Sequence, residues 1–317
     1  MRIAVFAAGA VGGYFGGRLA EAGQHVAFIA RGDHLRAIRE RGLRVDSIAG
    51  DVLIRPAEAT DDPAAVGQVD CVLVAVKSWQ LDTAARATPP LVGEETFVVP
   101  LLNGVEAPDL LSDVLGREHV LGGLCGLISS RAEPGVIRHV GADPWITFGE
   151  LDGGASDRSR ALLRALEACR GVKATLAEDI VAAMWEKFLF ISSTGGVGAV
   201  TRVPFGVFRS VPETRRLVEV AMREVLAVAA ARGVALTEQA VDRALALTDG
   251  LPPEGTSSMQ RDILAGRRSE LEAWNGAVAR LGRQAGVPTP THEAIFAALL
   301  PQELQARGEL KASDVSP

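Results

Sequence analysis

Residues 7–12, AAGAVG, follow a short apolar run and open a helical pattern near the N-terminus. Small residues at this spacing favour a tight strand-to-helix turn whose free N–H groups can bind the phosphates of a dinucleotide. Gly9 and Gly12 hold the second and third positions of the G-x-G-x-x-G pattern, and Ala7 holds the first, where alanine strains the turn without blocking it. The alternative is a packing turn that binds no ligand. The candidate cofactor-binding residues here are Ala8, Gly9, Ala10, Val11 and Gly12.

Arg31 follows the next expected strand, residues 25–30, at the place where the adenosine ribose of a bound dinucleotide would lie. An acidic residue usually bonds the ribose of NAD at this place, whereas an arginine suits the 2′-phosphate of NADP. The sequence therefore favours NADP(H). Asp33, two residues further on, leaves NAD open as an alternative because its carboxylate could bond a ribose.

Three polar residues stand at other places where chemistry is possible. Lys77 and Asn103 each follow an expected buried strand, so both fall at the carboxyl edge of a parallel sheet, where ligands bind in such folds. Lys187 interrupts the apolar helical segment MWEKFLFI. A lysine in such a segment either extends its ammonium to solvent or is held in a site.

Apolar strands alternate with helical segments through the first half of the chain. This alternation predicts a parallel sheet covered by helices on both faces. Residues 44–60 alternate like a hairpin, and strand-like pieces between 119 and 150 could extend the sheet by antiparallel pairing. The expected strands are residues 2–7, 25–30, 70–77 and 96–104, and the expected helices are residues 11–22, 34–42 and a helix that ends before Pro89.

From about Asp179 the periodicity is helical, with long helices expected at 214–234 and 269–287 and a last helix from about Thr291. We therefore expect an α/β fold in which a Rossmann-type dinucleotide-binding domain, residues 1–177, precedes an all-helical domain, residues 178–317. The polar tail after Leu310 is expected to fray.

Composition narrows the class of protein. A chain of 317 residues is too long for one typical core, and a formal net charge of -6 provides no positive field for nucleic acid. No apolar run approaches the roughly 20 residues of a membrane helix, and the N-terminus lacks the pattern of a secretory signal. The 3 cysteines and 5 histidines are scattered without metal-site spacing. We expect buried thiols, no metal and a cytoplasmic location.

Several short motifs occur in a specific order along the chain. Together they resemble the ketopantoate reductase family (2-dehydropantoate 2-reductases), which reduces a 2-keto acid with NADPH, and the resemblance covers nearly the whole length. It implies a Rossmann-type domain followed by a helical domain, in agreement with the pattern of elements. The matching features are the glycine turn, Arg31, K-x-W-Q at 77–80, Asn103-Gly104, W-E-K-F at 185–188, S-S-M-x-x-D at 257–262 and Glu270.

The resemblance implies a role for each matching polar residue in the first half. Lys77 and Gln80 match residues that help to hold the cofactor. Asn103 matches an asparagine near both nicotinamide and substrate, so we expect it to contact both. Without the resemblance, Lys77 would be interpreted as an ordinary exposed lysine at the end of a strand.

In the second half, Lys187 matches the catalytic lysine of the family. Its ammonium would stabilise the negative charge that hydride addition builds on a carbonyl oxygen, and would donate the proton. Glu270 matches the second catalytic residue, which positions the lysine and the substrate; the alternative is a solvated carboxylate near the neighbouring arginines. Ser258 matches a serine that binds the substrate carboxylate, and it could also cap a helix. Gly266 is expected to end the helix between Ser258 and Glu270.

Two positions depart from the family pattern. The family carries asparagines that contact substrate on the helix after the lysine, and here Ile191 and Gly195 stand in their places. Reduction of a different 2-keto acid is therefore an alternative to reduction of 2-dehydropantoate. A non-catalytic NADP-binding sensor is a second alternative, which Ala7 favours. The apolar helices of the second half could also pair in a homodimer.

Overall fold

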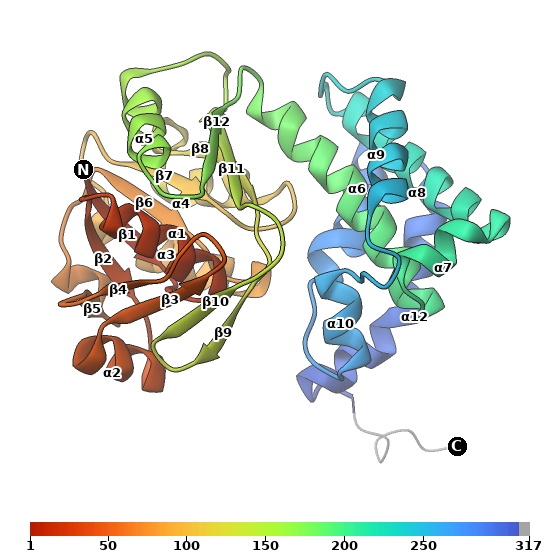
Figure 1. Ribbon diagram of the computed structural model, residues 1–317. Helices are drawn as coiled ribbons and strands as arrows, with labels where there is room; N and C mark the ends of the chain where they lie inside the picture. The colour runs from red at the N-terminus through yellow and green to blue at the C-terminus, as the bar shows by residue number, and fades with distance from the viewer. Residues whose placement is uncertain (311–317) are drawn as a thin grey trace. The chain divides into compact units, whose positions relative to one another are not determined.

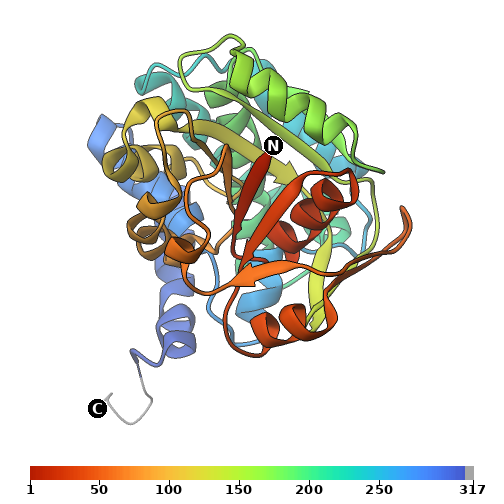
Figure 2. The same ribbon diagram turned by 90° about the vertical axis from the view of Figure 1, so that its left-hand side faces the viewer.

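The structure, a computed structural model, describes residues 1–310. It divides the chain into two compact units. Unit 1 comprises Met1–Leu102 and Glu106–Val181, and unit 2 comprises Asn103–Val105 and the chain from Ala182 onward. Figures 1 and 2 show the elements of each unit in two views. The expected fraying after Leu310 lies outside the described residues.

A five-stranded parallel sheet forms the centre of unit 1, in the order β5-β2-β1-β6-β7. This arrangement confirms the expected Rossmann-type α/β fold, because successive apolar strands are joined by helices. The strands are β1 (Arg2–Phe6), β2 (His25–Ile29), β5 (Glu58–Thr60), β6 (Cys71–Val74) and β7 (Phe97–Pro100).

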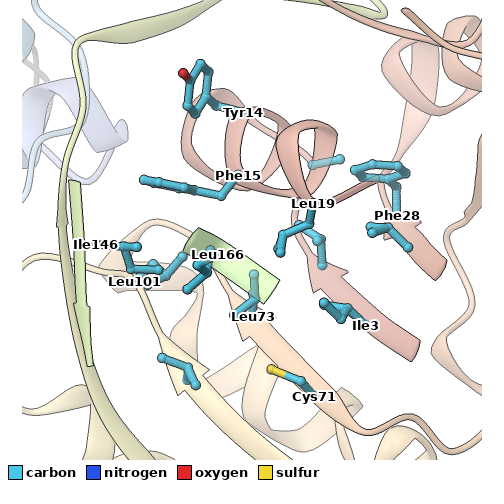
Figure 3. Close-up of a cluster of buried hydrophobic side chains, with 14 of the residues drawn as sticks. Ile3, Tyr14, Phe15, Leu19, Phe28, Cys71, Leu73, Leu101, Ile146 and Leu166 are labelled. Carbon is cyan, nitrogen blue, oxygen red and sulfur yellow. The ribbon is translucent and has the colours of Figure 1, made fainter. Parts of the chain in front are cut away.

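Strands β1, β2, β6 and β7 are buried on both faces along most of their length, which explains why they are apolar without alternation. Ile3 and Leu73 lie on one face in a cluster with Phe15 and Leu19 of helix α1, as Figure 3 shows. The intervening strand residues face the other way and pack with α3 and α4. The helices of unit 1 are α1 (Ala10–Glu21), α2 (Gly32–Arg41), α3 (Leu81–Ala87), α4 (Ala107–Leu115) and α5 (Asp157–Glu167).

The strands between residues 119 and 150 do not extend the parallel sheet by antiparallel pairing, so that interpretation is wrong; Val120 meets the sheet only through an isolated parallel bridge to Val98 of β7. β10 pairs in parallel with β3 and antiparallel with β9, and β11 pairs antiparallel with β8 and in parallel with β12. Two smaller sheets result, in the orders β4-β3-β10-β9 and β12-β11-β8, because the partners come from distant segments. These strands are β3 (Leu43–Ser47), β4 (Val52–Ile54), β8 (Leu121–Gly126), β9 (Ser129–Glu133), β10 (Val136–His139), β11 (Trp145–Glu150) and β12 (Lys173–Leu176).

The expected hairpin over residues 44–60 is correct only in its first part. β3 and β4 pair antiparallel, whereas β5 leaves them and pairs in parallel with β2 at the edge of the large sheet. The three cysteines are buried thiols within unit 1.

Unit 2 is helical, as expected. Helix α8 packs against α7, α9, α11 and α12. The segment 269–287 departs from the single helix expected there, because it begins with a π-helical turn, η5 (Glu272–Gly276), before α11. The helices are α6 (Ile180–Thr201), which begins at the end of unit 1, α7 (Phe205–Ser210), α8 (Pro212–Ala231), α9 (Glu238–Gly250), α10 (Ser258–Leu264), α11 (Ala277–Ala285) and α12 (Pro290–Arg307).

Candidate functional site

The turn after β1 has the backbone of a glycine turn although it begins with alanine. Ala7 adopts a φ of 78°, in the left-handed region that side chains other than glycine rarely occupy. The N–H groups of Ala7 and Ala8 both donate to the carbonyl of Ile29, at 3.1 and 3.0 Å. The turn is therefore strained and still closed, as the sequence predicts.

The two remaining glycines of the turn, Gly9 and Gly12, have different structural roles. A Cβ on Gly12 would collide with the carbonyl oxygen of Ala7 and lie 2.8 Å from Val5, so only glycine fits where α1 crosses β1. A Cβ on Gly9, by contrast, would meet nothing within 4 Å. Gly9 is the N-cap of α1 and has no side-chain cap, so the open space beside it adjoins the first turn of the helix, whose N–H groups have no intrahelical partner.

A pocket of about 350 Å³ lies within unit 1 at the carboxyl ends of β1, β2 and β6. Of the predicted cofactor-binding residues, Ala8, Gly9, Arg31 and Gln80 line it, whereas Ala10, Val11, Gly12, Lys77 and Asn103 do not. The other lining residues are Phe6, Ala7, Ile29, Ala30, His34, Val76, Trp79, Thr83, Ala84 and Arg131.

The charge of this pocket comes from two arginines. Arg31 and Arg131 line it, and no carboxylate does. Burial lowers the pKa of His34, the hydrogen bond to the carbonyl of Ala8 opposes this shift, and the nearby charge of Arg131 adds to it, which favours the neutral imidazole. Its Nε2 donates to the carbonyl of Ala8 at 2.7 Å because its Nδ1 accepts from Gly135 N–H at 2.9 Å.

Asp33, the residue that kept NAD open as an alternative, is exposed and paired with Arg36. It does not line the pocket. Arg131 could not be predicted from the sequence, because a single arginine in a short polar strand gives no signal of the pocket that tertiary pairing builds around it.

Lys77 is exposed and stands just outside the pocket lining. Its ammonium lies over the indole of Trp79, 5.7 Å from the ring centroid, and its backbone N–H faces Gln80 Oε1 at 3.4 Å. The K-x-W-Q motif is thus one local cluster, in which Trp79 and Gln80 form part of the pocket wall.

Three of the predicted site residues meet within unit 2. The ammonium of Lys187 donates to Asn103 Oδ1 at 2.8 Å, and Asn103 Nδ2 donates to Glu270 Oε2 at 3.3 Å. The partners fix the orientation of the amide, because an ammonium can only donate and an ionised carboxylate can only accept. Asn103 therefore links the cation to the anion.

Local structure explains how these three side chains are held. Lys187 lies on α6 between Trp185 and Phe188, whose rings are buried. Asn103 follows β7 by three residues, in a turn that Gly104 closes with a φ of 104°. The buried rings hold this part of α6 in unit 2, and the ammonium of Lys187 is directed to the amide of Asn103.

Glu270 is only 5% exposed, so the alternative of a solvated carboxylate is wrong. Arg267 pairs instead with Asp262 at 2.8 Å. Helix α10 ends at Leu264 and Gly266 has a φ of 65°, as expected of a residue that ends the helix. Buried Glu303 accepts hydrogen bonds from both the N–H and the hydroxyl of Ser269, at 2.9 and 2.6 Å, and so fixes the backbone beside Glu270.

Ser258 is the first residue of α10, and Ser257 rather than Ser258 caps that helix, accepting from Gln260 N–H at 3.0 Å. Within residues 1–310, the Ser258 hydroxyl forms no hydrogen bond to Lys187, Asn103 or Glu270, so the structure does not join it to the other three.

The two departures from the family pattern lie on the same face of α6 as Lys187, since positions four and eight residues later share a helix face. Ile191 is partly buried and Gly195 is buried. A Cβ on Gly195 would lie 2.6 Å from the indole of Trp274 and 3.4 Å from Ser257 Oγ. The indole therefore fills the space in which a larger residue would project.

Within residues 1–310, no group of three or more His, Cys, Asp or Glu side chains could hold a metal ion. Over the same part of the chain, no helix combines the length and the apolar character needed to cross a bilayer.

A doubly wound parallel sheet with a glycine turn, together with a lysine–amide–carboxylate cluster, defines a Rossmann-type oxidoreductase. The chain matches the family model "Ketopantoate reductase PanE/ApbA" over residues 3–153 and the model "Ketopantoate reductase PanE/ApbA C terminal" over residues 179–303. It belongs to the ketopantoate reductase family, which confirms the resemblance inferred from the motifs.

Relatives resemble the chain over almost its whole length. "Uncharacterized oxidoreductase YkpB" of Bacillus subtilis is 30% identical, over 94% of this chain and 98% of that protein. "2-dehydropantoate 2-reductase" of Halobacterium salinarum is 33% identical, over 92% and 95%. Among solved structures, 2-dehydropantoate 2-reductase from Geobacter metallireducens has a TM-score of 0.86 and 32% identity, over 95% of this chain and 99% of that chain.

Proposed function

We propose that the protein is an NADP(H)-dependent reductase of a 2-keto acid, with 2-dehydropantoate as the first candidate substrate and pantoate, a precursor of pantothenate, as product. The observation that carries the proposal is the hydrogen-bonded series Lys187–Asn103–Glu270 within unit 2. Relatives named 2-dehydropantoate 2-reductase, at 25% to 33% identity, support the choice of substrate.

Bound NADPH would supply a hydride to the carbonyl carbon of the keto acid. The ammonium of Lys187 then stabilises the negative charge that forms on the carbonyl oxygen and donates the proton that completes the alcohol. Asn103 accepts from this ammonium and so fixes its direction, and buried Glu270 holds the amide from its other end. In the same proposal, the hydroxyl of Ser258 donates to the carboxylate of the substrate.

The pocket of unit 1 fits the dinucleotide half of this proposal. Open space at Gly9 permits the pyrophosphate to approach the first turn of α1, where a side chain would obstruct it. Arg31 lines the pocket, and Asp33 is occupied by Arg36, so the groups available at the ribose favour a 2′-phosphate. NADP(H) is therefore proposed over NAD(H).

The direct test is steady-state oxidation of NADPH and of NADH by the purified protein with 2-dehydropantoate. We expect turnover with a strong NADPH preference. Lys187→Ala should lower kcat by about 10² to 10⁴ through loss of the proton donor and the positive charge. The matched control is Lys173→Ala, which removes an exposed lysine of β12 and should leave turnover unchanged.

Unchanged turnover of Lys187→Ala would refute the mechanism. NADPH binding without turnover on any 2-keto acid would instead support the sensor, which keeps the pocket and lacks the reaction. The lysine–amide–carboxylate cluster argues against the sensor, because a binding protein has no chemical need for it.

A second candidate substrate is a 2-keto acid with an apolar side chain. Ile191, one turn from Lys187, offers no hydrogen bond, and Trp274 covers Gly195 where a polar side chain could otherwise stand. A polar substrate group buried there would lose a partner. A panel of 2-keto acids separates the two candidates, and Ile191→Asn should raise kcat/KM for 2-dehydropantoate only if that substrate lacks a partner.

A cytoplasmic location and a homodimer belong to the same proposal. The three buried cysteine thiols suit a reducing compartment, and a net charge of -6 disfavours nucleic acid as a partner. Sedimentation at micromolar concentration tests the dimer, and a single monomer mass would refute it.

A further inference from the structure

Strand β9 passes the dinucleotide pocket between two anchors. At its first residue, the hydroxyl of Ser129 donates to the carbonyl of Ala10, at the start of α1, at 3.0 Å. Just beyond its last residue, Gly135 N–H donates to His34 in the first turn of α2 at 2.9 Å. Arg131 lies between these anchors, and it points to the same side as Ser129, about 7 Å further along the strand, because side chains alternate.

Arg131 is placed to bind an anion. It lines the same pocket as Arg31, and within residues 1–310 neither guanidinium forms an ion pair with a carboxylate. Both are exposed to solvent, and the charge of Arg131 reaches His34, whose pKa it helps to lower. Two positive groups at one pocket repel each other until an anion binds between or beside them.

The position of Arg131 selects among the phosphates of a dinucleotide. The pyrophosphate would lie at Gly9 and the first turn of α1, which is the Ser129 end of β9. Arg131 is displaced from that end toward α2, the helix that Arg31 immediately precedes. The adenosine ribose would lie at the same end of the pocket, after β2.

We propose that Arg131 binds the 2′-phosphate of NADP(H) together with Arg31, as a second determinant of cofactor specificity. A 2′-phosphate carries close to two negative charges at neutral pH and three acceptor oxygens, enough for two guanidinium groups. The inference rests on the proposed NADP(H) dependence. It assigns the discrimination between NADP(H) and NAD(H) to two separate elements, the end of β2 and strand β9.

Equilibrium binding tests the assignment independently of turnover. The dissociation constants of NADPH and NADH are measured by nicotinamide fluorescence with the full-length protein in phosphate-free buffer. Arg131→Ala should weaken NADPH binding about tenfold and NADH binding less than about twofold, since NADH lacks the 2′-phosphate. The affinity for adenosine 2′,5′-bisphosphate, measured by competition, should fall by the same factor as the affinity for NADPH.

Arg138→Ala is the matched control, because Arg138 is an exposed arginine on the neighbouring strand β10 and does not line the pocket. It should change neither constant. Equal weakening of NADPH and NADH by Arg131→Ala would place Arg131 at the pyrophosphate and overturn the assignment. Unchanged dissociation constants for NADPH and NADH in Arg131→Ala would overturn the assignment as well, because they would show that Arg131 contacts only solvent.

The outcomes also separate this inference from the proposed function. If the unmodified protein binds neither dinucleotide, both fail. If it binds NADPH but turns over no 2-keto acid, a selective loss in Arg131→Ala still establishes the 2′-phosphate contact, and only the proposed reaction fails.

Discussion

Replacing Ala7 with glycine should stabilise the protein. Its φ of 78° costs an L-residue about 1–2 kcal/mol, and glycine at this position avoids that cost. Glycine also has more conformational freedom in the unfolded chain, and this offsets about 0.5–1 kcal/mol of the strain that the substitution relieves. The two hydrogen bonds to Ile29 come from backbone N–H groups and remain in the variant. The net expectation is a gain of roughly 0.5–1 kcal/mol in the free energy of unfolding.

Urea denaturation followed by circular dichroism, without cofactor, measures this difference. With a slope of about 2–3 kcal/mol per molar urea, the midpoint should rise by about 0.3 M. Ala8→Gly is the matched control, since Ala8 is 1% exposed and its φ is not positive. That variant should lose stability, because it removes a buried methyl group and adds unfolded-state freedom. The reasoning about strain is wrong if Ala7→Gly lowers the midpoint as Ala8→Gly does.

Three further predictions concern other parts of the chain. Gly9→Ala should weaken NADPH binding at least about tenfold in a fluorescence titration while leaving the urea midpoint in place. The added methyl group meets no protein atom within 4 Å but enters the space in which the pyrophosphate is proposed to lie. An unchanged dissociation constant would contradict the placement of the pyrophosphate. Burial lowers the pKa of His292 from 6.5 to about 4, so the unfolded chain binds a proton there that the folded chain does not. The contribution of His292 to the free energy of unfolding is complete above pH 6.5. As the pH falls toward 4 this contribution is lost, which amounts to about 3 kcal/mol in total. The free energy of unfolding should therefore fall more steeply between pH 6.5 and 5 than in His292→Gln, and parallel slopes would exclude this role. Glu303→Gln should lower kcat about tenfold with little change in KM, because the charge that holds Ser269 beside Glu270 is lost; a change in KM alone, in steady-state assays, would contradict it.

The sequence predicts the elements of unit 1 more reliably than their pairing. Periodicity and glycine stops locate α1 and β2 within a residue or two, because apolar spacing and chain reversal are local properties. The partner of a strand is not local. Nothing in the strand residues 136–139 indicates that they pair with residues 44–47 rather than with the edge of the large sheet.

For the candidate site, too, the sequence predicts individual residues better than their contacts. Lys187, Asn103 and Glu270 could be named because each stands in a motif, but their hydrogen bonds join residues 84 and 167 positions apart. Arg131 stands in no motif, and only the pairing of β9 with β10 brings it to the pocket. Gly195 departs from the family pattern in the sequence, whereas the indole of Trp274 that fills its place could be found only in three dimensions.

The grouping of Asn103–Val105 with the helical unit bears on how this protein can be divided or recombined. A fragment that starts at Ala182 would contain Lys187 and Glu270 without the amide that joins them. The matched C-terminal segment, residues 179–303, is therefore incomplete as a chemical module. Exchanging this segment between relatives would replace Lys187 and Glu270 but not Asn103, which joins them. A functional chimera must therefore carry the turn after β7 together with the helices.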